Sequence, residues 1–257
     1  MKRHLAPFLI LCFCLTTNAS AQTVVDVVER PANNVTNTNY VTFRAPLQQV
    51  PLTKLPVGKI QPKGWLRKYL ELQKNGLNGQ LGTISAWLDK NNNQWLSNGG
   101  DHGWEEVPYW IRGYISLAYI LGDNAMKYEA NTWIRAVLSN QSSNGMLGPD
   151  GYDGNSPDLW AKMPMLWAMQ TYYEGTGDKR VLTAMEKYFQ WELTIPDEQF
   201  LKGLWQEKRG GDNLWSVLWA YNRTGNESIL PLVDKLHRNT SNWAMSGTLP
   251  NWHGVNI

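Results

Sequence analysis

Cysteine is almost absent from this chain of 257 residues, which contains only Cys12 and Cys14. Both lie in the apolar run Leu5–Leu15, which follows a basic N-terminus and precedes the small residues Ala19–Ala21. This order is typical of a secretory signal peptide, so we expect residues 1–21 to be removed and the protein to be secreted or periplasmic. Neither cysteine stands in a lipoprotein site. The mature chain then has no cysteine, which excludes a disulfide, a thiol nucleophile and a thiolate metal site within it.

An excess of charge of either sign is also missing. Loss of the signal peptide lowers the formal net charge from +2 to 0, which argues against nucleic acid and a charged membrane surface as partners. No second apolar run is long enough to cross a bilayer, so we expect no membrane insertion. The histidines His102, His237 and His253 lack the spacing of a metal site, and the sequence has no phosphate-binding glycine loop. We therefore expect no metal and no cofactor in this chain.

Tryptophan, in contrast, is abundant, with 14 residues that all lie outside the signal peptide. Its flat apolar face and polar edge suit core packing, and they also suit stacking against the C–H faces of sugar rings. Together with the low net charge and the expected export, this composition favours an oligosaccharide or polysaccharide as the ligand.

A pattern of two amphipathic segments around a glycine recurs three times, roughly 50 residues apart. The glycine pairs are Gly122-Asp123, Gly177-Asp178 and Gly225-Asn226. Apolar residues lie four, eight and eleven positions on either side, which is the spacing of successive turns on one helix face. The glycine is predicted to cap the first helix in the left-handed conformation, and the Asp or Asn to cap the second. Each unit is thus predicted to be a helical hairpin, at residues 104–141, 158–194 and 212–242.

The predicted fold class is all-α, an (α/α)6 toroid of stacked helix pairs. Residues 22–57 are predicted to form an extended arm, with a short strand near Tyr40–Phe43, and residues 58–257 to form part of the barrel. A first helix is expected at Trp65–Lys74, followed by a turn at Asn75–Gly82. Since about six pairs close a ring, three hairpins make up about half of it. We expect the chain to be truncated at its C-terminus and to need the missing C-terminal half.

Three long loops, at residues 91–103, 142–157 and 195–211, each precede the aromatic helix of a hairpin. We expect them to gather at one end of the array and to form the site there. No residue is assigned a catalytic role. The candidate substrate-binding residues are Asp101, His102, Trp104, Glu105, Glu106, Asp158, Trp160, Asp212, Trp215 and His253.

Two interpretations of the acidic candidates stay open. Acids at a helix start are stabilised by the helix dipole or cap the helix, which accounts for Glu105 and Glu106 in a first turn. Asp158 and Asp212 are likewise placed as N-caps at equivalent starts of the second and third hairpins. Alternatively, acids that converge between tryptophan walls are what a glycosidase pocket requires.

Four segments of the chain resemble the β-L-arabinofuranosidase-like glycoside hydrolases of family 127 and its relatives. They are Leu55–Leu66, Gly103–Trp110, Tyr172–Asp178 and Arg209–Leu214. The resemblance covers about residues 50–257. It implies an (α/α)6 catalytic barrel followed by β-sandwich domains, in an exported enzyme that acts on plant or microbial glycans.

The resemblance also bears on the chemistry. The family carries a zinc-bound cysteine nucleophile and a glutamate acid/base in the second half of the barrel, so zinc is expected in the full-length protein if that pattern holds. This chain alone is expected to be inactive. His253 matches a family histidine near the sugar, whereas Pro164 stands where the family places another histidine.

The chain is therefore predicted to be an exported glycoside hydrolase of the β-L-arabinofuranosidase type, to which it contributes pocket walls. A second hypothesis is a toroid of the unsaturated uronyl hydrolase type, with Asp158 or Asp212 as acid/base. A strongly basic pocket would favour that hypothesis, because its substrates are acidic sugars. A third is a non-catalytic glycan-binding toroid, in which substitution of Glu105 and Glu106 would lower affinity rather than turnover.

Overall fold

The computed structural model describes residues 27–29, 43–48, 52–96 and 100–243. Residues 1–32 and 33–257 form separate units, and in the first unit Val27–Glu29 contain no helix or strand. The predicted signal peptide and His253 lie outside the described residues, as does the predicted strand apart from Phe43. All elements named below belong to the second unit.

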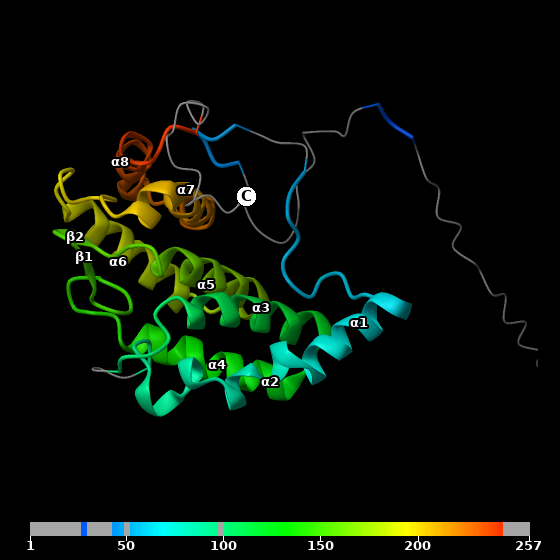
Figure 1. Ribbon diagram of the computed structural model, residues 1–257. Helices are drawn as coiled ribbons and strands as arrows, with labels where there is room; N and C mark the ends of the chain where they lie inside the picture. Colours follow the sequence, from blue (N-terminus) through cyan, green and yellow to red (C-terminus); the bar gives the residue numbers. More distant parts are fainter. Residues whose placement is uncertain (1–26, 30–42, 49–51, 97–99, 244–257) are drawn as a thin grey trace, which may run out of the picture. The chain divides into compact units, whose positions relative to one another are not determined.

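The second unit consists mainly of α-helices that follow one another in antiparallel pairs (Figure 1). The α-helices are α1 (Gly64–Asn75), α2 (Leu77–Ile84), α3 (Glu106–Leu121), α4 (Asn124–Ser139), α5 (Lys162–Thr176), α6 (Arg180–Thr194), α7 (Leu204–Thr224) and α8 (Pro231–Asn239). Short 3-10 helices lie at η1 (Ala86–Leu88), η2 (Lys90–Asn92) and η3 (Glu227–Ile229). Two short antiparallel strands, β1 (Tyr152–Asp153) and β2 (Ser156–Pro157), pair Tyr152 with Pro157. The predicted all-α class is confirmed, while closure of a ring stays a prediction.

The three hairpins turn at the predicted glycines. Gly122, Gly177 and Gly225 all have a φ of 71°, and the N–H of each donates to the carbonyl four residues earlier. A side chain at this φ is strained, which is why glycine ends each first helix. The left-handed C-caps predicted from the sequence are thus confirmed.

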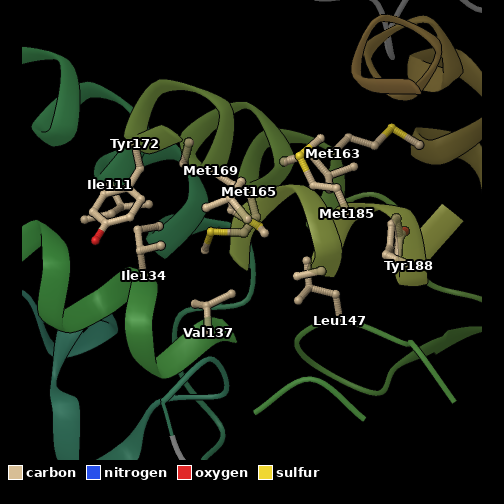
Figure 2. Packing of buried hydrophobic residues seen from close by; sticks show 14 of the residues in the cluster. Ile111, Ile134, Val137, Leu147, Met163, Met165, Met169, Tyr172, Met185 and Tyr188 are labelled. Atoms are coloured by element: carbon tan, nitrogen blue, oxygen red, sulfur yellow. The ribbon is translucent and has the colours of Figure 1, made fainter. Parts of the chain in front are cut away.

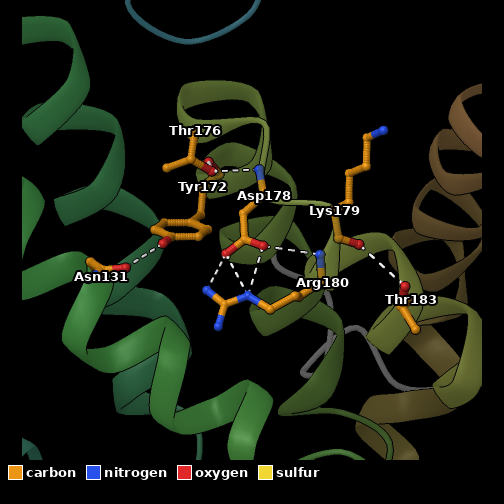
Figure 3. A network of polar contacts seen from close by, with 7 residues as sticks. All are labelled: Asn131, Tyr172, Thr176, Asp178, Lys179, Arg180 and Thr183. Carbon is orange, nitrogen blue, oxygen red and sulfur yellow. Dashed lines mark hydrogen bonds and ion pairs between the residues drawn. The ribbon is translucent and has the colours of Figure 1, made fainter.

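The polar residue after each glycine accepts a backbone N–H at the start of the next helical segment: Asp123 from Met126, Asp178 from Arg180 and Asn226 from Ser228. Figure 3 shows the second of these turns, where Asp178 also accepts from Nε of Arg180 at 2.9 Å. In the same view, the hydroxyl of Tyr172 donates to Asn131 at 2.6 Å and joins α5 to α4. The predicted caps therefore exist, and side-chain contacts connect the hairpins to one another.

The core lies between two rows of helices. The first helices of the hairpins, α3, α5 and α7, pack side by side in that order, and α4, α6 and α8 pack alongside them. Figure 2 shows Met163, Met165 and Met169 of α5 and Met185 of α6 among the buried residues of this core, which include Ile111 of α3 and Ile134 of α4. Methionine adapts its shape to irregular gaps, which suits a core shared by several helices.

Two glycine-containing segments that the sequence assigned to turns are helical instead. Helix α7 begins at Leu204, before the predicted start at Asp212, and contains Gly210. A Cβ on Gly210 would overlap the hydroxyl of Thr240, so this glycine allows close packing and does not end a helix. Similarly, α2 covers most of the predicted turn, and a Cβ on Gly82 would lie 3.2 Å from the Trp110 ring.

Residues 43–48 and 52–57 of the arm contain neither helix nor strand, and they contact the far ends of two hairpin helices. The backbone N–H of Arg44 donates to Asn222 at 3.0 Å, and Lys54 pairs with the buried carboxylate of Glu174 at 3.0 Å. These contacts hold the arm against the C-terminal halves of α5 and α7, away from the loops that precede these helices.

The carboxyl group of Glu192 lies fully inside the helical core. Glu192 of α6 accepts from the Asn213 amide of α7 at 2.7 Å. Burial raises the pKa of Glu192 to about 8, because its charged form loses hydration, and the positive charges of Lys235 and Lys162 only partly offset this. The ammonium of Lys235 donates to the main-chain carbonyl of Glu192, at 2.9 Å. The carboxyl group is therefore protonated in the folded state over a range in which the unfolded chain is ionised.

We expect the folded state to lose stability as the pH rises from about 4.5 to about 8, the ordinary and the folded pKa of Glu192. Between these values the folded state holds a proton that the unfolded chain has released, so the free energy of unfolding falls by up to ~1.4 kcal/mol per pH unit. Glu192→Gln keeps an acceptor for Asn213 and cannot ionise, so its stability should depend less on pH in this interval.

The measurement is urea denaturation at pH values spread across that interval. Glu198→Gln is the control, because Glu198 is exposed. The control should follow the wild-type curve. Parallel curves for the wild type and Glu192→Gln would contradict the assignment.

Candidate functional site

A cavity of about 800 Å³ lies at the end of the hairpins where α3, α5 and α7 begin. Its walls come from three parts of the chain: Gln94 with residues 100–104, residues 140–160, and Trp205 with Gln206. The first two are the predicted loops, and the third is the first turn of α7, within the segment predicted to be a loop. The predicted gathering of these segments at one end is confirmed.

Three tryptophans line the cavity. Trp104 precedes α3, Trp160 precedes α5, and Trp205 lies in the first turn of α7. Trp160 is buried, whereas Trp205 is 42% exposed and so offers a free face. The starts of three neighbouring helices therefore each supply an indole ring to the cavity.

Two tryptophan–carboxylate hydrogen bonds cross between the starts of α3 and α5. The indole N–H of Trp104 donates to the carboxylate of Asp158, and the indole N–H of Trp160 donates to Glu105 at 2.6 Å. Asp158 also accepts the backbone N–H of Trp160 at 2.9 Å. Each ring is thus held by its edge, while its face is left for packing.

Asp158 is not the N-cap of α5, because that helix begins at Lys162. Asp158 instead caps the turn that precedes the helix, because it accepts the Trp160 N–H. The predicted N-cap position is therefore wrong by one turn. Lys162 itself is buried and donates to the carbonyls of Pro149 and Asp158, both at 2.6 Å. Burial lowers the pKa of Lys162 to about 8. These hydrogen bonds hold the loop that forms the cavity wall near Pro149.

Asp101 and His102 have different positions although they are adjacent in sequence. Asp101 lines the cavity, and hydrogen bonds from His102 and Asn92 lower the pKa of its carboxyl group. The His102 ring packs against Trp87, with 5.1 Å between ring centroids, and lies beside the cavity. His102 therefore orients Asp101 and does not form a wall of the cavity.

Four further candidates lie away from the cavity walls. Glu105 receives the Trp160 indole and precedes α3, and Glu106 lies in the first turn of α3, where the helix dipole favours it. Asp212 lies in the third turn of α7 and is not an N-cap, which corrects the prediction. Trp215 lines a separate cavity of about 340 Å³ beside the arm. Trp215 lies outside the first cavity because α7 starts earlier than predicted. Trp205 therefore occupies the helix start where Trp215 was expected.

The sequence did not predict several residues at this end of the hairpins: Lys162, Trp205, Gln206, Arg112 and Arg209. Gln206 is buried and joins α7 to the segment before α5, because its side chain accepts from the Leu159 N–H and donates to Ser156, both at 2.9 Å. A tryptophan at the end of a long loop was the available signal for Trp205. The others carry no pattern that separates them from surface residues.

A zinc ion, which the family resemblance implies, finds no fitting donor set in the described part of the chain. No group of three or more His, Cys, Asp or Glu side chains there is arranged to hold a metal ion. We therefore derive no step through zinc from these residues.

Among the described helices, none is long and apolar enough to cross a membrane.

The helical hairpins place the chain in the all-α class, and a cavity lined by tryptophans suits a carbohydrate ligand. The sequence model of the family described as Beta-L-arabinofuranosidase, GH127 catalytic domain, matches residues 20–256. The chain belongs to this family, and the resemblance carried by the four segments is confirmed. Neither a search of curated proteins nor a search of solved structures gives a match. Membership implies glycoside hydrolase activity.

We expect Asp158→Ala to destabilise the protein by about 1–3 kcal/mol, because the Trp104 indole and the Trp160 backbone N–H both lose their acceptor. Asp150→Ala is the matched control, since Asp150 lines the same cavity but is exposed. Its effect should stay within about 0.5 kcal/mol. Urea denaturation of both variants measures the difference, and equal losses would show that the crossed hydrogen bonds do not stabilise this end.

Proposed function

We propose that this protein is an exported glycoside hydrolase of the β-L-arabinofuranosidase type that acts on plant or microbial glycans. The cavity at the helix starts binds the terminal sugar. The observation that supports this is a cavity with three tryptophans and three carboxylates in its wall, in a member of the arabinofuranosidase catalytic-domain family.

The cavity offers both kinds of contact that a sugar needs. The exposed face of Trp205 is apolar and suits the C–H face of a ring. The carboxylates of Asp101 and Asp158 accept hydroxyl protons, and the side chains of Gln94 and Asn140 add amide groups. Because Asp158 is held by Trp104, its remaining lone pairs keep a fixed direction. Pre-oriented acceptors of this kind lower the entropy lost on binding.

The described residues position the sugar in this proposal, and none of them is given the role of nucleophile or acid/base. If the family mechanism holds, the reaction retains configuration through a covalent intermediate. The buried ammonium of Lys162 keeps the Pro149 carbonyl in place and so fixes the cavity wall against which the sugar is bound. Two alternatives bind sugar in the same cavity: a uronyl hydrolase-type toroid and a non-catalytic glycan-binding toroid.

Trp205→Ala should weaken binding of an oligosaccharide that ends in β-L-arabinofuranose by about tenfold, since the stacking face is lost. Trp65→Ala is the matched control, because Trp65 is 80% exposed and lies on α1, outside the cavity wall. Titration calorimetry measures both. Equal affinity for wild type and Trp205→Ala would place the sugar elsewhere, and an absence of binding by the wild type would contradict the proposal.

Turnover separates the proposed enzyme from its alternatives. We expect a protein that carries the complete catalytic domain to release arabinose from the same oligosaccharide, as measured by chromatography. Glu105→Gln should reduce both binding and release by loosening Trp160. Release of an unsaturated uronate from a different substrate would favour the uronyl hydrolase, and binding with no release from any substrate would favour the glycan-binding toroid.

A further inference from the structure

Two arginines lie over tryptophan rings on the row formed by α3, α5 and α7. The guanidinium carbon of Arg112, on α3, is 4.1 Å from the centroid of the Trp167 ring. The guanidinium carbon of Arg209, on α7, is 4.9 Å from the Trp160 ring. A guanidinium in this position is attracted by the ring face and keeps its N–H edge free for hydrogen bonds.

Both tryptophan rings are fixed by hydrogen bonds at their edges. The Trp160 indole donates to Glu105, just before α3, at 2.6 Å. The Trp167 indole donates to the main-chain carbonyl of Asp212, on α7, at 3.2 Å. Each ring is therefore attached to a neighbouring helix as well as to its own segment, and it presents a fixed face to its arginine.

The two arginines also act on the same pair of groups, Tyr109 and Asp212. Arg112 follows Tyr109 on α3, and Asp212 follows Arg209 on α7, each by three residues, so each pair shares a helix face. Burial raises the pKa of Asp212 and of the Tyr109 hydroxyl, and the positive charges of both arginines oppose these shifts. Successive helices thus bring two cations to one half-buried surface, which we call the arginine face (Tyr109, Arg112, Trp167, Arg209 and Asp212).

The guanidinium groups of these two arginines form no hydrogen bond and no ion pair with a described residue. Elsewhere in the described chain, Arg180 pairs with Asp178 at 2.5 Å and Arg238 pairs with Asp197 at 3.3 Å. Asp212 lies close enough to act on both arginines but forms no ion pair with either, and Glu105 accepts the Trp160 indole. The donors of Arg112 and Arg209 are therefore left for a ligand.

We propose that the arginine face binds the carboxylate of a uronic acid residue in the glycan substrate. This rests on the proposed function, because it assumes that the cavity beside this face binds a sugar. The planar guanidinium fork matches a carboxylate in two parallel hydrogen bonds. Asp212 and the hydroxyl of Tyr109 bind the neighbouring sugar hydroxyls. The substrate class is thus an acidic, uronate-containing glycan.

A carboxylate fits this face better than a neutral sugar does. A ligand that covers the two half-buried arginines removes water from them, which costs free energy unless the ligand supplies compensating charge. A neutral hydroxyl accepts a hydrogen bond but does not neutralise a guanidinium. A uronate does both, and its ring also packs on the exposed ring of Tyr109, which lies 6.1 Å from that of Trp160.

Trp160 connects the arginine face to the cavity. It lines the cavity, and Arg209 lies over its ring. A glycan whose terminal sugar occupies the cavity would therefore place its next residue near Arg209. This arrangement assigns the terminal arabinose to the tryptophan walls and the uronate to the arginines, on a single substrate.

The test compares a galacturonic acid disaccharide with the neutral galactose disaccharide of the same linkage. Titration calorimetry on the full chain at low salt should give at least about tenfold tighter binding of the acidic sugar. Arg112→Gln and Arg209→Gln should each remove most of this preference and change the affinity for the neutral sugar little. Arg209→Lys should restore only part, since an ammonium lacks the planar fork. Arg238→Gln, a charge change at an exposed side chain of α8, is the control and should keep the preference.

Three results would overturn the proposal. They are equal affinity for the two disaccharides, an equal loss for both in the arginine variants, and competition by inorganic sulfate as strong as that by the uronate. If any one of these results occurs while the arabinose-ended oligosaccharide still binds in a Trp205-dependent way, the uronate assignment fails and the proposed function stands. If no saccharide binds, both fail.

Discussion

The hydrogen bond from the Trp160 indole to Glu105 fixes a ring on which both parts of the candidate site depend. One consequence is the cavity wall, since Trp160 stands between the loops that precede α3 and α5. The other is the arginine face, since Arg209 lies over the same ring. An indole held only by apolar packing would be free to tilt, whereas a ring held at its N–H keeps one orientation. The start of α3 therefore sets the geometry of residues that belong to α5 and α7.

Buried polar groups carry the same kind of constraint through the rest of this end. Lys162 holds two loop carbonyls, Gln206 ties α7 to the segment before α5, and Glu192 accepts from Asn213 of α7. Each of these groups costs desolvation free energy when it is buried, and its hydrogen bonds offset that cost only if the geometry is kept. Apolar contacts alone would allow the loops to slide. The polar contacts define one position for each loop, which is what a binding site for a specific sugar needs.

Much of the fold follows from the sequence because its signals are local. Left-handed glycine caps at Gly122, Gly177 and Gly225, with a polar cap after each, place three hairpins to within a few residues at their turns. The gathering of loops at one end then follows from the alternation of helix directions. Part of the site follows as well, since Asp101, Trp104, Asp158 and Trp160 line the cavity. Helix α2 and the start of α7 do not follow, because Gly82 and Gly210 resemble turn residues in sequence and act as packing residues in the structure.

The arginine face shows why the remainder of the site could not be predicted. Hydrophobic periodicity finds a helix by its apolar face, but the buried face of α7 begins with Gln206, Gly210 and Asn213. No apolar stripe marks the first half of this helix, so its first turns look like loop. The sequence therefore gives wrong helical positions for the site residues of α7 relative to those of α3 and α5. Only the packed structure shows that Arg209 and Asp212 lie level with Arg112, and that both arginines lie over tryptophans of the segment between them. The polar, half-buried start of α7 therefore contributes to the arginine face in the fold. Because it has no apolar pattern, the sequence does not predict that surface.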